Sequence, residues 1–257
     1  MNKLNLMYEG KAKRVYSTDR DDLVMIEYKD DATAFDGKKR GTIEQKGIAN
    51  NLLSNHFFSL LEKEGIKTHF VKQLSERETL VKSVRIIPIE VIIRNRAAGS
   101  LCKRLGLEEG TRLTHTVLEF CYKNDELGDP MINDYHIRAL NLASEAEVER
   151  IVSLSLKINE ILRNYLLKTD LELIDFKLEF GRFNGDIILA DEISPDTCRL
   201  WDAKTQEKLD KDRFRRDLGA VEEAYREVLR RIQNQGDQGD QGDGSIDCGK
   251  FNNGSVS

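Results

Sequence analysis

Long apolar runs are missing from this 257-residue sequence, and their absence limits where the protein works. No stretch approaches the roughly 18 consecutive apolar residues that a membrane-spanning helix needs. The first residues, MNKLNLMYEGKAK, also lack the apolar centre of a secretory signal peptide. We therefore expect a cytoplasmic protein with no membrane partner.

The sequence also lacks an excess of basic residues. Its 40 lysines and arginines are outnumbered by 45 aspartates and glutamates, which gives a formal net charge of −5. A negatively charged chain has no general electrostatic attraction for the phosphate backbone of a nucleic acid. Nucleic acid is therefore not an expected partner.

Cysteine and histidine are scarce and scattered. The four cysteines show neither C-x-x-C spacing nor a histidine at ligand spacing, which is typical of reduced thiols and not of a zinc site (Cys102, Cys121, Cys198 and Cys248). No activating base is evident for Cys198, so a cysteine nucleophile is not expected. The histidines are isolated, and we assign none of them a catalytic role.

Apolar residues almost disappear beyond Gln233. Residues 234–257 read NQGDQGDQGDGSIDCGKFNNGSVS, a Gly-Asp-Gln repeat followed by mostly polar residues. Such a segment buries too little surface to offset the entropy lost on ordering. We expect residues 234–257 to form a disordered low-complexity tail.

The chain before the tail mixes strand and helix patterns. Residues 4–17, 23–28, 68–74 and 79–84 predict strands, 30–37 a loop, and the apolar spacing in 48–61 a helix. The first 85 residues therefore predict a strand-rich unit with one main helix. Further on, a strand is expected from Ile86, a capping box at Ser144 and Glu147 predicts a long helix to about Lys168, and two helices are expected over 212–219 and 220–233.

Residues 171–202 carry the sequence pattern that says most about function. Apolar and charged residues alternate from Ile174 to Phe180, as in a half-buried strand, and the charged positions share one face (Asp175, Lys177 and Glu179). Asn184-Gly185 is a strong hairpin signal, and the returning apolar run ends in Asp191. The hairpin is therefore expected to gather one lysine and several carboxylates.

Two interpretations of these charges remain open. Charged residues on the outer face of an antiparallel sheet are common and stabilise it slightly. Alternatively, the cluster binds magnesium and phosphate, because Mg²⁺ takes one or two carboxylates together with nucleotide phosphates. A nearby lysine would neutralise an anionic substrate.

The register of this hairpin decides whether Glu179 and Asp191 can act together. If Asn184-Gly185 is the whole loop, a regular strand points Asp191 away from Glu179. If residues 183–185 form a three-residue loop, Asp191 lies opposite Lys177 on the face that carries Glu179. We predict the three-residue loop, because the chemistry of the second interpretation needs both carboxylates on one face.

Two other segments carry candidate anion-binding residues. Gly10 lies between two expected strands, and Lys11 and Lys13 would point the same way if strand geometry continued through them. This is not the G-x-x-x-x-G-K-[ST] phosphate loop, so an ordinary surface hairpin remains open. Arg94 and Ser100 flank the expected start of a helix, where an arginine, a hydroxyl and free N–H groups suit a phosphate monoester. A surface arginine beside an ordinary helix cap is equally compatible.

Five segments, in this order, resemble one known family. They are YEGKAKRVY (8–16), IPIEVIIRNRAAGS (87–100), DPM (129–131), LIDFKLEFG (173–181) and DEISPDTCRLWD (191–202). The family they resemble is SAICAR synthetase, the phosphoribosylaminoimidazole-succinocarboxamide synthase of purine biosynthesis. The tail departs from the family pattern.

The resemblance implies a two-domain α+β fold, an activity and an assembly. An amino-terminal ATP-binding lobe would span residues 1–85 and a substrate-binding lobe residues 86–233. An ATP-dependent ligase would join carboxyaminoimidazole ribotide (CAIR) to L-aspartate through an acyl phosphate and give SAICAR, ADP and phosphate, with ATP and Mg²⁺ required. A homodimer is what the resemblance suggests.

The resemblance also implies residue roles. Gly10, Lys11 and Lys13 would lie over the ATP phosphates, while Glu179 and Asp191 would hold Mg²⁺. The other expected contacts are with the substrates: Lys177 with the reacting carboxylate, Arg94, Ser100 and Arg199 with the ribotide phosphate, and Asp129, Asp175 and Asp196 as polar contacts to the ribotide or aspartate.

Two readings from other classes remain. A phosphotransferase with the same nucleotide lobe would phosphorylate an alcohol without needing L-aspartate. A nucleotide-binding protein without activity would bind ATP but show no turnover. Aspartate-dependent release of ADP in the presence of the ribotide separates all three.

Overall fold

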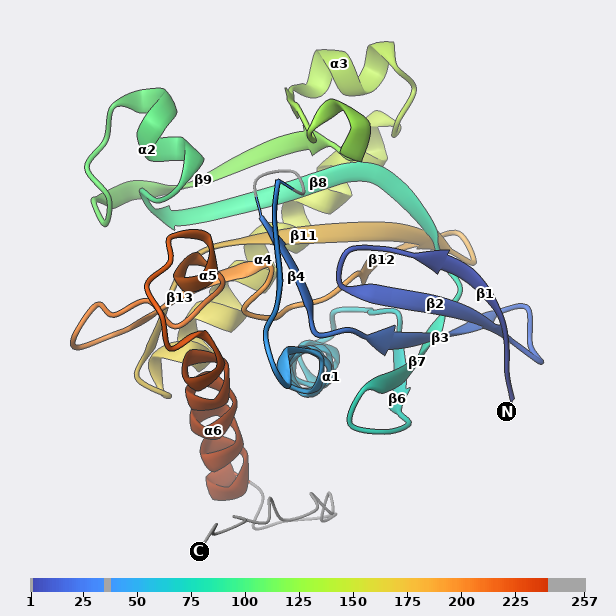
Figure 1. The fold of residues 1–257 in the computed structure, drawn as a ribbon. Coiled ribbons are helices and arrows are strands. Elements are labelled where there is room, and N and C mark those ends of the chain that lie inside the picture. The colour runs from blue at the N-terminus through green and yellow to red at the C-terminus, as the bar shows by residue number, and fades with distance from the viewer. Residues whose placement is uncertain (1, 35–37, 240–257) are drawn as a thin grey trace, which may run out of the picture.

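The computed structural model describes residues 2–34 and 38–239 and consists of two main antiparallel sheets with helices packed around them (Figure 1). The first sheet has the order β1-β2-β3-β7-β6. Its strands are β1 (Lys3–Glu9), β2 (Lys13–Thr18), β3 (Leu23–Tyr28), β6 (Phe70–Gln73) and β7 (Glu78–Lys82). All five lie in the first 85 residues.

The second sheet has the order β10-β9-β8-β11-β12, and β13 also pairs with β11. Its strands are β8 (Arg85–Arg96), β9 (Arg112–Tyr122), β10 (Met131–Ile132), β11 (Leu171–Phe183), β12 (Asp186–Ala190) and β13 (Cys198–Asp202). β11 pairs with β8 along one edge, and β12 and β13 share its other edge. Charged residues from three neighbouring strands are therefore brought beside those of β11.

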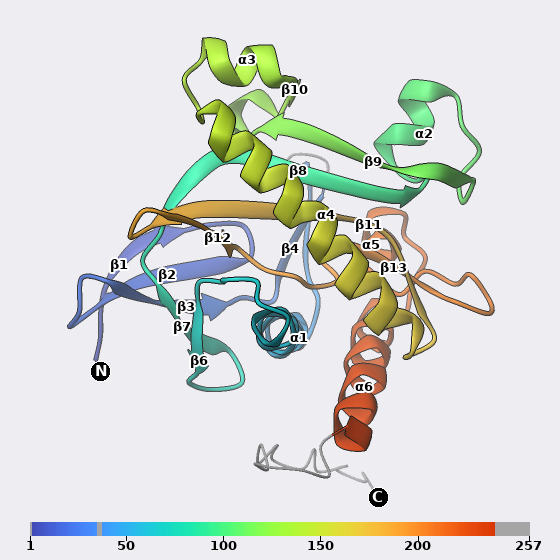
Figure 2. The same cartoon turned by 180° about the vertical axis from the view of Figure 1, so that it is seen from behind.

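Helices connect and cover these sheets. They are α1 (Lys46–Lys63), α2 (Ser100–Leu105), the 3₁₀ helix η1 (Asp125–Leu127), α3 (Asp134–Ala139), α4 (Glu145–Leu167), α5 (Asp212–Arg215) and α6 (Val221–Gly239). The predicted capping box of α4 is confirmed, because Ser144 Oγ accepts from Glu147 N while Ser144 N donates to the Glu147 carboxylate. In Figure 2, which views the molecule from behind, α4 crosses in front of β8 and β11.

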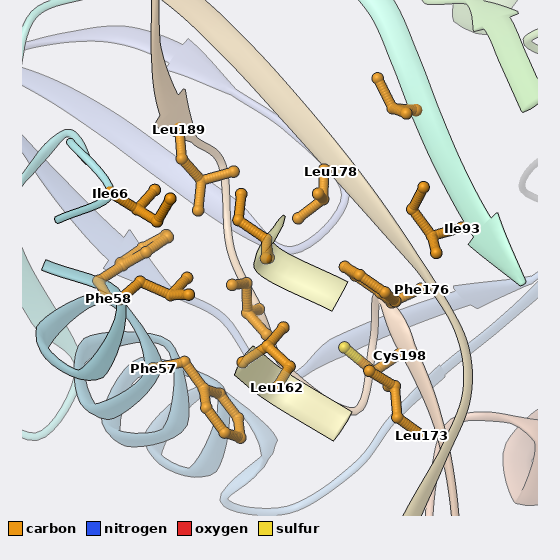
Figure 3. Close-up of a cluster of buried hydrophobic side chains, with 14 of the residues drawn as sticks. Phe57, Phe58, Ile66, Ile93, Leu162, Leu173, Phe176, Leu178, Leu189 and Cys198 are labelled. Carbon is orange, nitrogen blue, oxygen red and sulfur yellow. The ribbon is translucent and has the colours of Figure 1, made fainter. Parts of the chain in front are cut away.

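One apolar cluster joins the two sheets through α1. Phe57 and Phe58 of α1 lie in it with Leu162 of α4 and Phe176 and Leu178 of β11 (Figure 3). These side chains are almost fully buried, and each such burial contributes roughly 1.5–3 kcal/mol. The proposed boundary between residues 85 and 86 falls where β8 begins, although this cluster contains residues from both sides of it.

Several local predictions need correction. Residues 31–34, part of the predicted loop 30–37, form strand β4 (Asp31–Ala34), which pairs with β5 (Lys39–Thr42). The strand β9 was not predicted at all. β11 is buried on both faces rather than half-buried, because ion-pair partners from neighbouring segments cover its charged side chains: Arg94 and Arg199 contact Asp175, and Lys123 contacts Glu179.

The carboxyl-terminal helix is also longer than predicted. α6 continues past Gln233 to Gly239, because extending an existing helix costs less than nucleating one. The rest of the predicted tail, residues 240–257, lies outside the described residues. In the described part of the chain, no helix is long and apolar enough to span a membrane.

Candidate active site

The β11–β12 hairpin has a two-residue loop, so the predicted three-residue loop is wrong. Phe183 pairs with Asp186, and Glu179 pairs with Ala190. Asn184 and Gly185 both have positive φ, 50° and 84°, as a type I′ turn requires. This turn matches the twist of the two strands without a third loop residue.

Asp191 nevertheless faces the same lysine as Glu179. Lys177 Nζ lies 2.6 Å from Glu179 Oε1 and 3.7 Å from Asp191 Oδ2. Asp191 is the first residue after β12, and its φ of 62° places it in the left-handed region, so strand alternation no longer applies to its side chain. The two carboxylates therefore converge as predicted, but through a local backbone turn and not through the predicted register.

These residues form part of a larger group, which we call the carboxylate–lysine cluster. It consists of four acidic and three basic residues: Glu90, Glu179, Asp191, Glu192, Lys13, Lys123 and Lys177. Lys123 Nζ lies 2.9 Å from Glu179 Oε1, and Lys177 Nζ lies 2.8 Å from Glu90 Oε1. Lys13 contacts Asp191 and lies 3.2 Å from Glu192 Oε1.

Burial and opposite charges set the protonation of this cluster. Burial opposes the charge on Asp191, but Lys13 and Lys177 outweigh it and hold the pKa of Asp191 well below its ordinary value. Burial likewise opposes the charge on Lys177, yet Glu179, Asp191 and Glu90 hold its pKa well above the ordinary lysine value. Asp191 and Lys177 are therefore both charged at neutral pH.

Burial has the larger effect on Glu90. Its pKa is raised by burial, although Lys177 opposes the shift, and the neighbouring Glu179 adds to it. Glu90 pairs directly with Glu179 across β8 and β11, so two like charges lie opposite one another with Lys177 between them. This arrangement favours a cation at the cluster.

Lys123 and Glu90 were not predicted as site residues. Lys123 follows β9, and β9 pairs with β8 so that Cys121 lies opposite Glu90. Unless β9 is assigned, no local pattern places Lys123 beside Glu179. The only available signal was the alternation of apolar and polar residues before Lys123, which could have predicted the strand β9.

The two lysines of the β1–β2 hairpin diverge. Lys13 begins β2 and reaches Asp191, whereas Lys11 lies in the loop and pairs with Asp125 of η1, with Nζ to Oδ1 at 2.7 Å. The expectation that they point the same way is wrong, because residues 10–12 are not extended strand. Gly10 lies in this loop, where an added Cβ would be 2.9 Å from the ring of Tyr8.

The predicted phosphate-binding residues form a second group, the arginine cluster, around Asp175, two residues before Lys177 on β11. Arg94 is 2% exposed, and its Nη1 donates to Asp175 Oδ2 at 2.8 Å. Its Nη2 donates to Ser100 Oγ at 3.0 Å, and its Nε to Glu119 at 2.8 Å. Arg94 is therefore fixed between two carboxylates and the first residue of α2.

Arg199 approaches the same carboxylate from β13. Its Nη1 donates to both oxygens of Asp175, at 3.0 and 2.8 Å, and its Nε donates to Asp212 Oδ2 at 2.9 Å. Burial opposes its charge, but Asp175 and Asp212 hold the pKa of Arg199 well above its ordinary value. Gly99 has a φ of 56°, and a Cβ there would lie 2.5 Å from Arg199 Nη2, so this position needs glycine.

Asp129 and Asp196 lie apart from the arginine cluster. Asp129 accepts from the backbone N–H of Asn124 at 2.8 Å. Asp196 is buried and binds three side chains from other elements: Lys46 Nζ at 2.9 Å, Lys211 Nζ at 3.1 Å and the Tyr225 hydroxyl at 2.6 Å. Asp196 thus connects α1 and α6 to the β12–β13 loop.

The donor set can be tested for metal binding. In the described ranges, no group of three or more His, Cys, Asp and Glu side chains is arranged to hold a metal ion. Glu179 and Asp191 supply two carboxylates, which is the number that Mg²⁺ commonly takes when phosphates complete its shell. Both carboxylates lie beside Lys177. Two protein ligands are too few for an all-protein metal site but fit Mg²⁺ bound together with a nucleotide.

The sequence matches the model of the SAICAR synthetase family over residues 6–232. A phosphoribosylaminoimidazole-succinocarboxamide synthase from Caldanaerobacter subterraneus subsp. tengcongensis is 65% identical over 233 residues, which cover 91% of this chain and 99% of that protein. The chain belongs to the SAICAR synthetase family. It is accordingly a ligase of purine biosynthesis.

Solved SAICAR synthetase structures have the same fold. The synthase from Ehrlichia chaffeensis has a TM-score of 0.88 and 48% identity, covering 89% of this chain and 98% of that chain. A SAICAR synthetase solved in complex with ADP has a TM-score of 0.86 and 54% identity, covering 88% and 97%. The predicted α+β SAICAR synthetase fold is therefore confirmed.

Proposed function

We propose that this SAICAR synthetase uses ATP to join the carboxylate of CAIR to the amine of L-aspartate, giving SAICAR, ADP and phosphate. The main supporting observation is that β11 carries both charged clusters, with Lys177 in one and Asp175 in the other. A phosphate monoester bound by the arginine cluster would leave the rest of the ribotide free to extend along β11 towards Lys177. The ADP bound to the 54%-identical relative supports nucleotide use.

The chemistry requires activation of a carboxylate. An amine cannot displace oxide from a carboxylate, so an oxygen of the CAIR carboxylate first attacks the γ-phosphorus of ATP and ADP leaves. The aspartate amine then attacks the carbonyl carbon of this acyl phosphate, phosphate leaves, and the nitrogen loses a proton. Both steps depend on positioning and charge neutralisation, and neither needs an enzyme nucleophile.

Lys177 is the residue that meets the reacting carboxylate. Its ammonium group is charged and held by Glu90, Glu179 and Asp191. It can therefore bind the carboxylate of the substrate without moving far. Lys13 lies on the opposite side of Asp191 and would neutralise the phosphates of ATP. Gly10 and Lys11 precede it in the loop, where Lys11 would exchange its exposed contact with Asp125 for a phosphate.

Glu179 and Asp191 would hold Mg²⁺ when the nucleotide binds. The ion would supply positive charge at the ATP phosphates. The protein's contribution is to hold both carboxylates beside Lys177, while Lys13 and Lys177 keep the pKa of Asp191 well below its ordinary value. The lysines that neutralise them would then be released to bind phosphate oxygens.

Arg94, Ser100 and Arg199 would bind the ribotide phosphate. Asp175 lies between the two guanidinium groups and would hold both in place instead of touching the phosphate. Asp129 would be a polar contact to the ribotide or to aspartate, since its charge is close enough to the carboxylate–lysine cluster to raise the pKa of Glu90. Asp196 is the remaining polar residue proposed at the substrate lobe, next to Lys211.

The organisation of the enzyme follows the same proposal. The ATP-binding lobe comprises residues 1–85, the substrate lobe residues 86–233, and the assembly is a homodimer in the cytoplasm. A light-scattering mass in solution tests the assembly. A mass equal to one chain would contradict the homodimer.

A coupled assay for ADP release tests the proposed reaction. Continuous release of ADP should need ATP, magnesium, CAIR and L-aspartate together, and one SAICAR should form for each ADP. A phosphotransferase would release ADP continuously without L-aspartate, and a binding protein without activity would release none. Either result would contradict the proposed ligase reaction.

A further inference from the structure

Two of the three guanidinium nitrogens of Arg199 donate hydrogen bonds to carboxylates. Nη1 binds Asp175 and Nε binds Asp212, on two different sides of the guanidinium group. Within residues 2–34 and 38–239, Nη2 has no hydrogen-bond partner, and it lies against Gly99, just before Ser100. The two carboxylates thus fix the plane of the guanidinium so that Nη2 remains available at the start of α2.

Asp212 is itself held by the chain around it. Its backbone N–H donates to Asp210 Oδ1 at 2.7 Å, and Asp210 Oδ2 accepts from the N–H of Leu200 at 2.9 Å. Asp210 therefore ties the start of α5 to the residue that follows Arg199 on β13. Arg215 Nη1 occupies the other Asp212 oxygen at 2.6 Å, so the carboxylate that faces Arg199 cannot rotate away easily.

Asp212 is too buried to contact a substrate itself. The side chain of Asp212 is 1% exposed, whereas that of Arg199 is 18% exposed. A ligand can therefore reach Arg199 but not Asp212. Asp212 is therefore placed to act on a ligand through Arg199, which it contacts.

We propose that Asp212 is a positioning residue that aims Arg199 at the phosphate of the ribotide. This inference rests on the proposed function, in which Arg199 binds that phosphate. Removing the Asp212 charge would free one side of the guanidinium and leave Asp175 as its only acidic partner. Ribotide binding would weaken because the available N–H group would no longer be held towards Ser100.

Asp212→Asn is the direct test, with steady-state kinetics measured against each substrate separately. We expect the KM for the ribotide to rise about tenfold, while the KM for ATP and kcat change less than twofold. Asp202→Asn is a matched control, because Asp202 is also buried, pairs with Arg231 and accepts from two backbone N–H groups. Its loss should lower stability without changing the ribotide KM.

A double-mutant cycle distinguishes positioning from general destabilisation. In an Arg199→Ala background, Asp212→Asn should have no further effect on the ribotide KM. If Asp212→Asn does not fold, Asp212→Glu replaces it, and its longer side chain should raise the ribotide KM at least threefold without changing the ATP KM. An unchanged ribotide KM in both folded variants, or full additivity with Arg199→Ala, would overturn the inference.

The same cycle separates this inference from the proposed function. If Arg199→Ala leaves ribotide binding unchanged, the phosphate site itself is wrong. If Arg199→Ala weakens binding but the Asp212 variants do not, only the positioning role of Asp212 is wrong.

Discussion

Asp191 Oδ2 lies 3.7 Å from Lys177 Nζ, although Asp191 comes after the last paired residue of β12. The left-handed backbone at Asp191 makes this approach possible. Glu179 reaches the same ammonium by ordinary strand geometry. The acidic pair proposed to bind magnesium therefore depends on one turned residue at a strand end.

Asp191→Asn should reduce kcat about 100-fold or more and weaken magnesium-dependent ATP binding, because a fixed charge at the reacting phosphates is lost. The melting temperature should fall little, since Lys13 keeps Glu192 as a partner and Lys177 keeps Glu90 and Glu179. Steady-state kinetics and ATP titration with and without magnesium check this. Asp186→Asn on the same hairpin is the control, because Asp186 pairs with Lys67 on the surface. Full activity of the Asp191 variant would contradict the metal role.

Arg94→Ala and Arg199→Ala should each weaken ribotide binding about tenfold to hundredfold. A charged hydrogen bond contributes on the order of 1.5–3 kcal/mol, which corresponds to that range. ATP binding should hardly change. Calorimetric titration of each ligand measures both, and loss of ATP binding with unchanged ribotide binding would contradict the assignment. Arg94→Ala should also lower stability, because the buried carboxylates of Asp175 and Glu119 each lose one of their two arginine partners.

Asp210 should make stability depend on pH. Burial, and then the neighbouring Asp212, raise the pKa of Asp210 to about 7. Because the folded pKa exceeds the unfolded value, the stabilising protonated form is lost as pH rises from about 4 through 7. Stability should therefore fall over that window, by up to about 1.4 kcal/mol per pH unit from this group.

Asp210→Asn should flatten that fall, because asparagine does not ionise. Urea denaturation between pH 5 and 8 measures the difference in slope between wild type and variant. Asp202→Asn is the control, since hydrogen bonds from the Thr205 N–H and Arg231 lower the pKa of Asp202 and its titration lies below this window. Equal slopes for wild type and Asp210→Asn would contradict the assignment.

Gly185→Ala should destabilise the fold by about 1–2 kcal/mol, because Gly185 has a φ of 84° and nothing lies near an added Cβ. The cost is therefore conformational and not steric. Thermal unfolding measures it, with Gly65→Ala as a second open left-handed position away from the hairpin. A stability change in Gly65→Ala but none in Gly185→Ala would argue against the type I′ turn.

The sequence predicted the residues of the site better than it predicted how they meet. Alternation along β11 placed Lys177 beside Glu179, because both lie on one strand and need no long-range information. Lys123 reaches Glu179 only through the pairing of β9 with β8 and of β8 with β11, which local patterns do not encode. Asp191 depends on a backbone angle that alternation cannot predict.

The fold shows the same division. The helix α4 was predictable because its capping box and apolar stripe are contained in its own sequence. The short strands β4 and β5 lack an apolar pattern and are ordered by contacts from elsewhere, such as Lys39 with the backbone oxygen of Phe214 at 2.5 Å. Their order depends on contacts with segments that are distant in the sequence, which local patterns do not show.

Oxygen-18 transfer from the carboxylate of CAIR tests the proposed reaction at its first step. CAIR labelled in both carboxylate oxygens is incubated with ATP, magnesium and L-aspartate, and the released phosphate is analysed by mass spectrometry. The acyl phosphate route predicts one labelled oxygen in each phosphate and one in the new amide of SAICAR. Unlabelled phosphate formed together with SAICAR would contradict phosphorylation of the substrate carboxylate beside Lys177.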